Sequence, residues 1–433
     1  MRRYNSYKDS ETEWIGEIPS HWLMVKPWTI FTPEKRPTLP DDEIITCFRN
    51  GIVTLRKNRR EDGFTNSLKE IGYQRIHEGD LVVHEMDGFE GSIGVSDSFG
   101  KSTPVYTVIK ESNLHNNRFW MFLLREMSNT RYIECLSKSI RERTTEFRWN
   151  TWKTEFFPSP PLSEQQQIVT FLDTKTSLID SLVEKTQRKI ELLKEKRTSL
   201  INEVVTKGLN SNVEMKDSGV EWIGEIPSHW ECSKVKYFVN FDSGFSFKSD
   251  DYCDEGIPLI RIGSLYNNIL SLDRSPVFLP KEFQIDYNQF IVEKDDILIS
   301  MTGTLGKRDY GYSILYKEDF PSFLNQRVGR IRISSNKIIL QYLMYCLLSE
   351  PFLLQLFSKP TGTKQGNFSS EDIIGNYFGC PSTKEQHEIV EYLDEQTQLI
   401  DKTISIEEKR IELLKEYHQS LISEVVTGKR KVV

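Results

Sequence analysis

The chain has 433 residues, of which 38% are hydrophobic, 27% charged and 11% aromatic, and its formal net charge is −7. This composition is typical of a folded globular protein, because a disordered chain has few aromatic residues and little apolar surface to bury. The negative charge disfavours a simple basic DNA-binding protein, so any attraction for nucleic acid has to come from local patches or from partner subunits. At roughly 100–200 residues per domain, the chain has room for two or more domains.

Cysteine spacing and hydropathy indicate a cytoplasmic protein. The six cysteines form no CxxC pair, which disfavours a disulfide framework or a zinc site and favours free thiols in a reducing compartment. The longest apolar stretch, residues 338–348, is too short for a membrane span, which needs ~20 residues. No apolar segment follows the first residues, so no secretion signal is expected.

The sequence EWIGEIPSHW, which we call the box, occupies residues 13–22 and occurs again unchanged at residues 221–230. Ten identical residues with two tryptophans in each copy indicate an internal repeat rather than chance. Parts that recognise different targets should differ between the copies. We therefore expect the box tryptophans to pack within a shared scaffold rather than to stack on bases.

Between the first box and a long polar segment lies a variable region, residues 23–157, that predicts mixed α/β structure. Residues 79–84 (GDLVVH) and the glycine-containing segment 88–94 predict strand, turn and strand. Residues 118–124 (RFWMFLL) predict a helix, and a polar loop, residues 141–148, ends the region.

Two long segments, residues 164–206 and 385–427, are identical at 23 of 43 positions and predict helices. Apolar residues recur in steps of three, four and seven, and neither segment contains proline or glycine. At ~1.5 Å per residue, each helix is expected to be roughly 65 Å long.

Start and stop signals flank both predicted helices. Ser163 and Thr383 are candidate N-terminal caps, although they are out of step with each other by one residue. Gly208 and Gly428 lie where the helices are expected to stop.

The apolar stripe of each long helix needs a partner. Because two equivalent stripes are present in one chain, we expect them to pair with each other; the alternative is that each packs only on its own globular domain. The expected pairing residues are Ile168, Leu172, Ile179, Val183, Ile190, Leu193, Leu200 and Val204 in the first helix, and Ile389, Leu393, Ile400, Ile404, Ile411, Leu414, Leu421 and Val425 in the second.

The second variable region, residues 231–380, has the same order of elements with a different sequence. Residues 295–300 (DDILIS) are followed by MTGTLG, residues 340–348 predict a helix, and residues 361–368 form a polar loop. A duplicated scaffold with diverged inserts is the pattern expected of two domains that recognise different targets.

Basic and amide side chains in both variable regions are candidates for contacts with DNA. Lysine and arginine neutralise phosphates, and arginine, asparagine and glutamine can bond to base edges. The alternative is that these clusters are solvated surfaces with intramolecular ion pairs. The candidates are Arg56, Lys57, Arg59, Arg60, Arg141, Arg143 and Arg148 in the first region, and Lys248, Arg261, Thr302, Lys307, Arg308, Asn325, Gln326, Arg327, Lys364, Gln365 and Asn367 in the second.

A search for catalytic motifs identifies no catalytic or metal-binding residue. Gly100–Thr103 (GKST) lacks the glycine that a phosphate loop requires five positions earlier, because position 95 is valine. No GxGxxG, HExxH or GxSxG is present, and no Asn/Asp-Pro-Pro-aromatic motif of amino-methyl transfer is found.

The repeated box, the segments Ile257–Gly263, Thr302–Thr304 and Asn325–Val328, and the closing Glu-Gln-x-x-Ile-Val helices together resemble the specificity subunit of a type I restriction–modification enzyme. The resemblance covers nearly the whole chain. It implies an α+β fold in which two mixed α/β target-recognition domains are separated by two long helices. These helices pair as an antiparallel coiled coil, which gives an internal pseudo-two-fold repeat.

The same resemblance implies the division of labour in the complex. Each recognition domain binds one half of a split, asymmetric sequence in double-stranded DNA. Two methyltransferase subunits, which use S-adenosylmethionine, and restriction subunits, which use ATP and Mg²⁺, are the expected partners. This chain itself is expected to bind no cofactor and to catalyse nothing.

The expected domains are a first recognition domain with its box (residues 1–160), a first long helix (161–210), a second recognition domain with the repeated box (211–382), and a second long helix with a tail (383–433). Two alternatives remain: a stand-alone DNA methyltransferase or nuclease with unrecognised motifs, and a coiled-coil scaffold that binds no nucleic acid.

Overall fold

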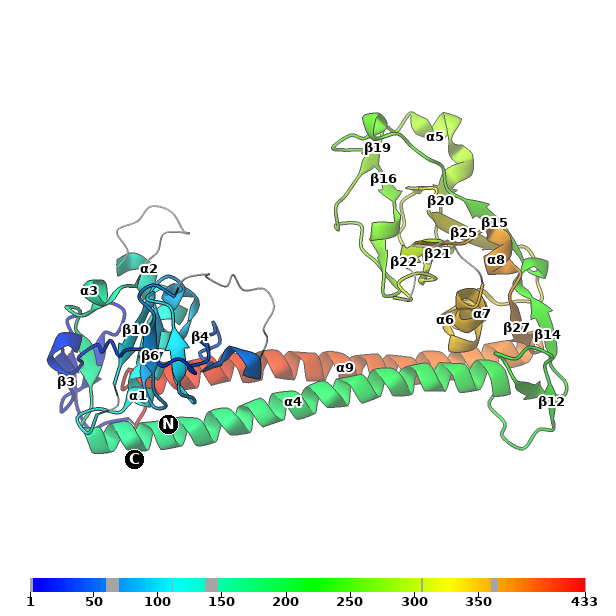
Figure 1. The fold of residues 1–433 in the computed structure, drawn as a ribbon. Helices are drawn as coiled ribbons and strands as arrows, with labels where there is room; N and C mark the ends of the chain where they lie inside the picture. The colour runs from blue at the N-terminus through cyan, green and yellow to red at the C-terminus, as the bar shows by residue number, and fades with distance from the viewer. Residues whose placement is uncertain are drawn as a thin grey trace. The chain divides into compact units, whose positions relative to one another are not determined.

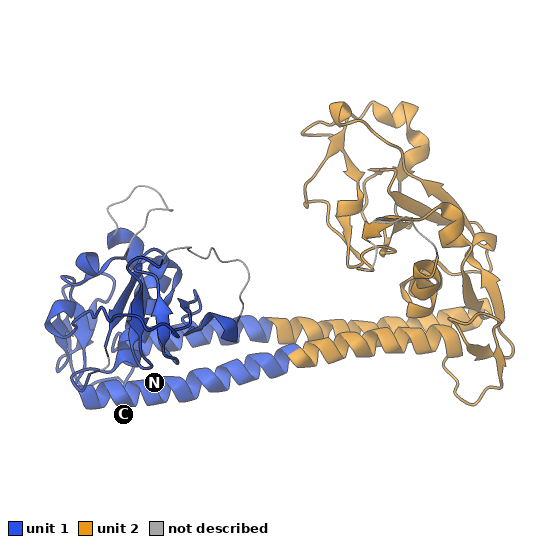
Figure 2. Ribbon diagram, viewed as in Figure 1, with its two compact units in different colours: residues 1–187, 409–433 blue, residues 188–408 orange. Residues whose placement is uncertain are grey.

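The computed structural model describes residues 3–59, 70–110, 112–136, 147–304, 307–359 and 365–432. The chain divides into two units, residues 1–187 with 409–433, and residues 188–408 (Figure 2). Each unit contains one strand-rich domain and part of two long helices, α4 (Leu162–Lys207) and α9 (Thr383–Val426) (Figure 1). Among these residues, no helix is long and apolar enough to cross a lipid bilayer.

The domain of the first unit packs short strands around the amphipathic helix α1. Its elements are β1 (Tyr7–Asp9), β2 (Glu17–Pro19), β3 (Leu23–Val25), β4 (Ile45–Cys47), β5 (Val53–Leu55), β6 (Gln74–Ile76), β7 (Leu81–His84), β8 (Ile93–Val95), β9 (Gly100–Ser102), β10 (Tyr106–Ile109), α1 (Asn117–Asn129), α2 (Tyr132–Leu136), α3 (Trp149–Trp152) and β11 (Phe157–Ser159). The central sheet has the antiparallel order β10-β7-β8, and β7 is buried because its alternating side chains pack into two cores, Leu81 and Val83 on one face and Val82 on the other. Its Leu-Val-Val sequence suits such a strand. Asn116 caps α1 by accepting bonds from the backbone N–H groups of Arg118 and Phe119.

The domain of the second unit contains two four-stranded sheets, in the orders β15-β25-β21-β23 and β19-β16-β24-β20. Its elements are β12 (Met215–Asp217), β13 (Glu225–Pro227), β14 (Glu231–Lys234), β15 (Val239–Ser243), β16 (Ile257–Ile260), β17 (Leu265–Tyr266), β18 (Ile269–Leu270), β19 (Phe278–Leu279), α5 (Phe283–Asp286), β20 (Ile291–Val292), β21 (Ile297–Ser300), β22 (Thr302–Thr304), β23 (Ser313–Leu315), β24 (Ser322–Leu324), β25 (Val328–Ile333), α6 (Leu340–Leu348), α7 (Glu350–Phe357), β26 (Gln365–Asn367), α8 (Ser370–Ile374) and β27 (Tyr377–Cys380). Helices α6 and α7 lie beside the long helices (Figure 1).

The sequence signals predict the C-terminal ends of the long helices more accurately than the N-terminal starts. Gly208 and Gly428, with φ of 73° and 75°, lie just beyond the last helical residues in the left-handed region that glycine adopts freely, as predicted. The predicted capping residues lie one or two positions later than the residues that precede α4 and α9 in the structure. Ser163 lies inside the first turn of α4, and Thr383 is already helical, while the hydroxyl of Ser382 accepts a bond from the Glu385 N–H at 3.3 Å.

The long helices pair antiparallel. In the second unit, Lys189 Nζ lies 2.5 Å from Glu407 Oε1 and Arg197 Nε lies 2.9 Å from Asp401 Oδ1, so the residue number falls along α9 as it rises along α4. In the first unit, His418 lies 3.8 Å from Asp180. These last two residues occupy the positions equivalent to Arg197 and Asp401 in the repeat, so the same contact recurs in both units. The predicted α+β fold with a long antiparallel helix pair is confirmed.

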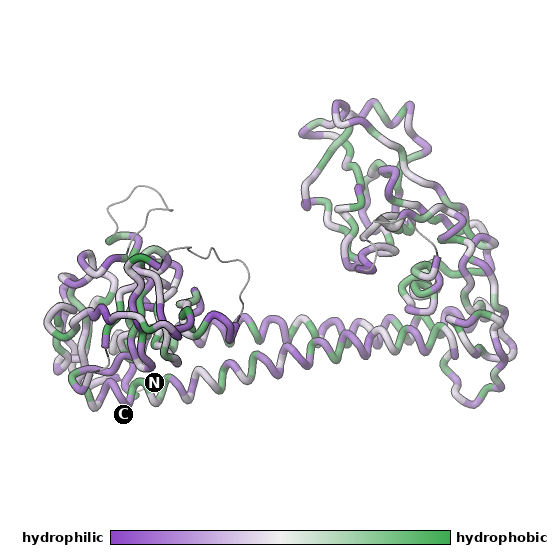
Figure 3. The backbone as a smooth tube through the Cα atoms, viewed as in Figure 1, coloured by the Kyte–Doolittle hydropathy of each residue, from purple (hydrophilic) through white to green (hydrophobic). Residues whose placement is uncertain are grey.

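The helices bury their apolar stripes against each other and against the domains together. Hydrophobic residues recur along both helices (Figure 3). Ile168, Leu172 and Ile179 share a buried core with Leu421 and Val425 and with the first domain. In the second unit, Val204, Ile389 and Leu393 share a core with the second domain. Of the expected pairing residues, Val183, Leu193, Leu200 and Leu414 are partly buried and the others are buried. From the sequence, each stripe was expected either to pair with the other stripe or to pack on its own domain. In the structure both contacts are present, and in each unit they form a single core.

A carboxylate near the start of each long helix holds the preceding box. Glu164 Oε1 accepts bonds from the Tyr4 hydroxyl at 2.6 Å and from Trp22 Nε1 at 3.2 Å, and its Oε2 lies 2.8 Å from His21 Nε2. We call this arrangement the carboxylate clamp. A buried indole N–H without an acceptor is unfavourable, and Glu164 supplies this acceptor to Trp22. The clamp therefore stabilises the attachment of the end of the box to the helix.

The second copy repeats the clamp. Glu385 accepts a bond from Trp230 Nε1 at 3.0 Å and lies 3.1 Å from His229 Nε2. Both clamped tryptophans are fully buried, and Trp14 stacks on Tyr132 with ring centroids 5.2 Å apart. Trp14, Trp22 and Trp230 therefore pack within the scaffold, as expected for the box tryptophans. Trp222, in contrast, leaves 40% of its surface exposed.

We expect Glu164→Ala to destabilise the first unit by about 1–3 kcal/mol, because it leaves the buried Trp22 N–H without an acceptor. Glu385→Ala should cost less, because that carboxylate holds two side chains rather than three. Urea unfolding of the full chain, followed by circular dichroism, measures both. The matched control is Glu388→Ala, an exposed carboxylate on α9 that should change stability by less than about 0.5 kcal/mol. An unchanged midpoint for Glu164→Ala would contradict the clamp.

Candidate nucleic-acid interface

Strands β22 and β26 of the second domain form a two-stranded antiparallel ribbon that brings together residues far apart in the sequence. Thr302 pairs with Asn367, Gly303 with Gly366, and Thr304 with Gln365. Thr302 Oγ1 donates a hydrogen bond to Asn367 Oδ1 at 2.9 Å. A ribbon of this kind fits the major groove of B-form DNA.

The neighbouring loop between β24 and β25 adds a cation to the ribbon. Arg327 Nη1 donates to Asn367 Oδ1 at 2.8 Å, and the side chains of both residues are exposed. Three of the candidates from the sequence, Thr302, Arg327 and Asn367, therefore meet at one place.

Two glycines and an aromatic residue explain the close approach of the ribbon to the domain. A Cβ built on Gly303 would lie 2.5 Å from Tyr310 Cδ1, and one on Gly366 would lie 3.4 Å from the same ring. Burial raises the pKa of Tyr310, and the adjacent carboxylate of Asp309 adds to this. Sequence analysis named neither Asp309 nor Tyr310. The available signal was the glycine in each strand, which marks close backbone approach.

The remaining candidates of the second domain have other bonds, are exposed or half-buried, or are only partly described. Arg261 Nη2 donates to the Ser275 carbonyl at 2.8 Å, and Arg308 stacks on Phe357, 5.4 Å from the ring centroid. Lys248, Lys307 and Gln326 are exposed, and Asn325 is half-buried. Lys364 lies outside the described residues, and only the backbone of Gln365 is described.

In the first domain, the basic run that begins at Arg56 bonds to its own domain. Arg56 Nε donates to Thr46 Oγ1 at 3.2 Å, and Lys57 forms an ion pair with Glu43. Both side chains of this pair are about half exposed, so the ion pair lies on the solvated surface, and a contact of Lys57 with DNA stays a prediction.

The other first-domain candidates are more dispersed. Arg59 donates to Asn50 Oδ1 at 2.8 Å and lies 4.5 Å from the centroid of the Phe48 ring. Arg148 is exposed at the start of α3. The remaining candidates of this domain, Arg60, Arg141 and Arg143, lie outside the described residues.

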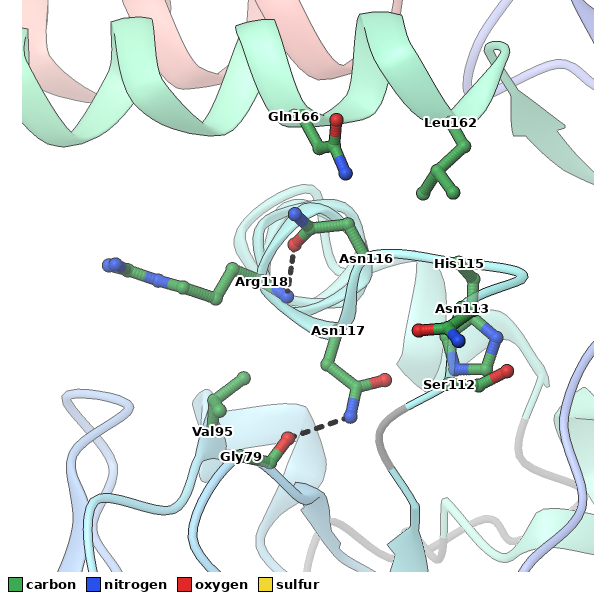
Figure 4. A pocket seen from close by; sticks show the side chains of 10 residues that line it. All are labelled: Gly79, Val95, Ser112, Asn113, His115, Asn116, Asn117, Arg118, Leu162 and Gln166. Atoms are coloured by element: carbon green, nitrogen blue, oxygen red, sulfur yellow. Dashed lines mark hydrogen bonds between the residues drawn. The ribbon is translucent and has the colours of Figure 1, made fainter.

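A polar cavity of about 400 Å³ lies at the N-terminus of α1 (Figure 4). Its side chains join structural elements. Asn117 Nδ2 donates to the Gly79 carbonyl at 2.8 Å, and the Asn116 N–H donates to Gln165 Oε1 on α4 at 2.9 Å. The corresponding contact in the second unit is Ile339 N–H to Gln386 Oε1 at 2.8 Å. Because the contact recurs, we assign it to attachment of the domain to its long helix rather than to ligand binding.

Comparisons with known proteins agree with the duplicated fold. Residues 227–416 match the family model described as the type I restriction modification DNA specificity domain. The type I restriction enzyme MjaVIII specificity subunit of Methanocaldococcus jannaschii is 30% identical over 280 residues, which are 64% of this chain and 62% of the relative. The EcoBI specificity subunit of Escherichia coli is 23% identical over 80% of this chain and 73% of its own length. The chain thus spans less than two thirds of the first relative.

Solved structures share the fold at low sequence identity. A chain from a study of complex assembly and conformational transition in the type I R-M system has a TM-score of 0.67 at 14% identity, and covers 94% of this chain and 98% of its own. The HsdS subunit of Thermoanaerobacter tengcongensis has a TM-score of 0.57 at 15% identity, over 95% of this chain and 98% of its own. Residues 227–416 thus carry the type I restriction modification DNA specificity domain, and the chain is similar to type I restriction enzyme specificity subunits in sequence and in fold.

Proposed function

We propose that this chain selects the DNA sequence on which a type I restriction–modification complex acts. Each strand-rich domain recognises one half of a bipartite, asymmetric site. The observation that carries the proposal is the duplication. Boxes, clamps and long helices are repeated, while the exposed polar residues of the two domains differ. The ribbon with Thr302, Arg327 and Asn367 is the part of the second domain best suited to bind base edges.

The paired helices fix the distance between the two half-sites in this proposal. Helices α4 and α9 are each continuous, over 46 and 44 residues. A helix pair with a shared apolar core resists bending and sliding, so the number of helical residues determines the number of unread base pairs.

Partner subunits supply the chemistry. Methyltransferase subunits bind S-adenosylmethionine and methylate adenine, and restriction subunits use ATP and Mg²⁺, whereas this chain binds no cofactor and has no catalytic residue. The complex works in the cytoplasm.

Helix α9 carries a second apolar stripe, which is exposed and is suited to bind a helix of a partner subunit. Tyr392, Leu399 and Ile406 recur every seven residues, and the last two leave 60% and 58% of their surface exposed. We call these three residues the outer stripe. Leu178 and Leu192 on α4 are exposed in the same way. Exposed apolar residues at heptad spacing are typical of a helix that pairs with another helix. We propose that the methyltransferase subunits dock here.

Replacement of residues 231–380 by the corresponding region of another family member should change one half of the recognised sequence and leave the other half and the gap unchanged. The reason is that the clamp at Glu385 and the helices remain in place. Methylome sequencing of cells that carry the swapped gene and its partner genes measures this. A change in both half-sites would contradict the independence of the two domains.

Insertion of four residues after Arg188 and after Lys409, which are equivalent positions of the repeat, should lengthen the gap by about one or two base pairs. The insertion adds one helical turn, ~6 Å, to both helices. Both half-sites should be retained in the methylome. The control is the same insertion in α4 alone, which shifts one stripe against the other and should abolish methylation. An unchanged gap in the double insertion would show that the helices do not set it.

Leu399→Glu should prevent association with the methyltransferase subunit without lowering the stability of the chain, because this residue is exposed in the chain by itself. Co-purification followed by size-exclusion chromatography measures association. Ser405→Glu, an exposed change on the same helix with the same change in charge but on a different face, is the control and should leave association intact. Normal assembly with Leu399→Glu would exclude the outer stripe as the docking surface.

A further inference from the structure

The side-chain amide of Asn367 is held in one orientation. Its Oδ1 accepts bonds from Thr302 Oγ1 at 2.9 Å and from Arg327 Nη1 at 2.8 Å. A guanidinium group can only donate, so the atom of Asn367 that faces it has to be the oxygen. Both lone-pair directions of Oδ1 are thus used within the protein. The Nδ2 group has no bond to any of the described residues, so the amide offers donors to a ligand.

Arg327 adds further donors of the same kind. Only one of its five N–H groups is used on Asn367, and the side chain is exposed. Within the part of the chain that the structure describes, no carboxylate lies at ion-pair distance from Arg327. This distinguishes it from Arg330 and Arg332, which pair with Asp242 and Asp296.

Backbone bonds fix the three residues relative to one another. The Met301 N–H donates to the Arg327 carbonyl at 3.0 Å, and the Phe368 N–H donates to the Met301 carbonyl at 2.9 Å. Met301 and Phe368 are the chain neighbours of Thr302 and Asn367. The backbone segments that carry the three side chains are therefore hydrogen-bonded to one another. Because they are already ordered, the loss of conformational entropy on ligand binding is small.

The bases differ in whether they accept or donate in the major groove. Guanine presents two acceptors, O6 and N7, whereas cytosine presents the N4 donor and adenine presents one acceptor beside the N6 donor. An asparagine that binds adenine needs its Oδ1 to accept from N6, and in Asn367 this atom is already used. Thymine presents the single acceptor O4. The planar pair of donors on the Arg327 guanidinium therefore matches guanine best, because only guanine presents two neighbouring acceptors.

From this we infer that the second domain recognises a guanine with Arg327 as the base-contacting residue, while Thr302 and Asn367 are positioning residues that fix the guanidinium and keep a competing acceptor away from the base. The inference rests on the proposed function and deepens it, because it gives the chemistry of one base in the second half-site. A phosphate also accepts hydrogen bonds, and the experiment separates these two ligands.

The experiment uses the full chain with its methyltransferase partner and selects bound duplexes from a randomised DNA library. Arg327→Lys keeps the charge that a phosphate needs but loses the planar pair of donors. We expect the preference for guanine at one position of the second half-site to fall roughly 10- to 100-fold, with the other half-site unchanged. Arg274→Lys is the matched control, an exposed arginine of the same domain that stacks on Tyr266, and it should change nothing.

A second variant tests the positioning role on an exposed residue whose change leaves the core intact. Asn367→Asp gives Arg327 a carboxylate partner, and guanine preference should fall at the same position as in Arg327→Lys. Thr302→Val should weaken preference at that position only.

The outcomes separate the inference from the proposed function. A second half-site without guanine on either strand, or full guanine preference with Arg327→Lys, overturns the inference while the proposed function stands. A uniform loss of affinity over all sequences with Arg327→Lys, together with a shallower salt dependence, assigns the residue to a phosphate and also overturns it. A wild-type complex without any sequence preference overturns the proposed function itself.

Discussion

The burial of one apolar stripe on each long helix is the constraint from which the rest of the architecture follows. A helix of 46 residues with a continuous apolar stripe is unstable alone in water, and most of its stability has to come from packing. In this chain the packing partner of each helix is both the other helix and a domain, in a single core for each unit. The domains are thereby attached along the helix pair rather than by flexible linkers, and the carboxylate clamps fix the point of attachment.

The repeated parts of the fold could be predicted from the sequence because the information is local or duplicated. Heptad-like spacing and the absence of glycine and proline defined both long helices, and Gly208 and Gly428 marked their ends. The starts were predicted less well, because Ser163 and Thr383 are good capping residues that happen to lie already inside the helix. The role of Glu164 and Glu385 was not predicted, since their partners in the boxes are more than a hundred residues away.

The candidate interface was predictable only as a set of residue types. Sequence patterns named Thr302, Arg327 and Asn367 separately, but no pattern indicates that segments 25 and 40 residues apart meet at one amide oxygen. In the same way, the local sequence does not indicate that Lys57 forms an ion pair with Glu43. Long-range contacts decide which polar groups of a surface remain available, and these contacts depend on strand pairing that the local sequence does not specify.

Along the ribbon, the residues available to a ligand alternate with the residues that pack on the domain. Thr302 and Asn367 lie at one level of the ladder, and Gly303 and Gly366 at the next, against Tyr310. Substitutions at the first pair alter what the surface offers to a ligand without disturbing the core, whereas a side chain at Gly303 would collide with Tyr310. In the proposed function, such a strand can acquire a new preference for DNA one residue at a time and remain folded at each step.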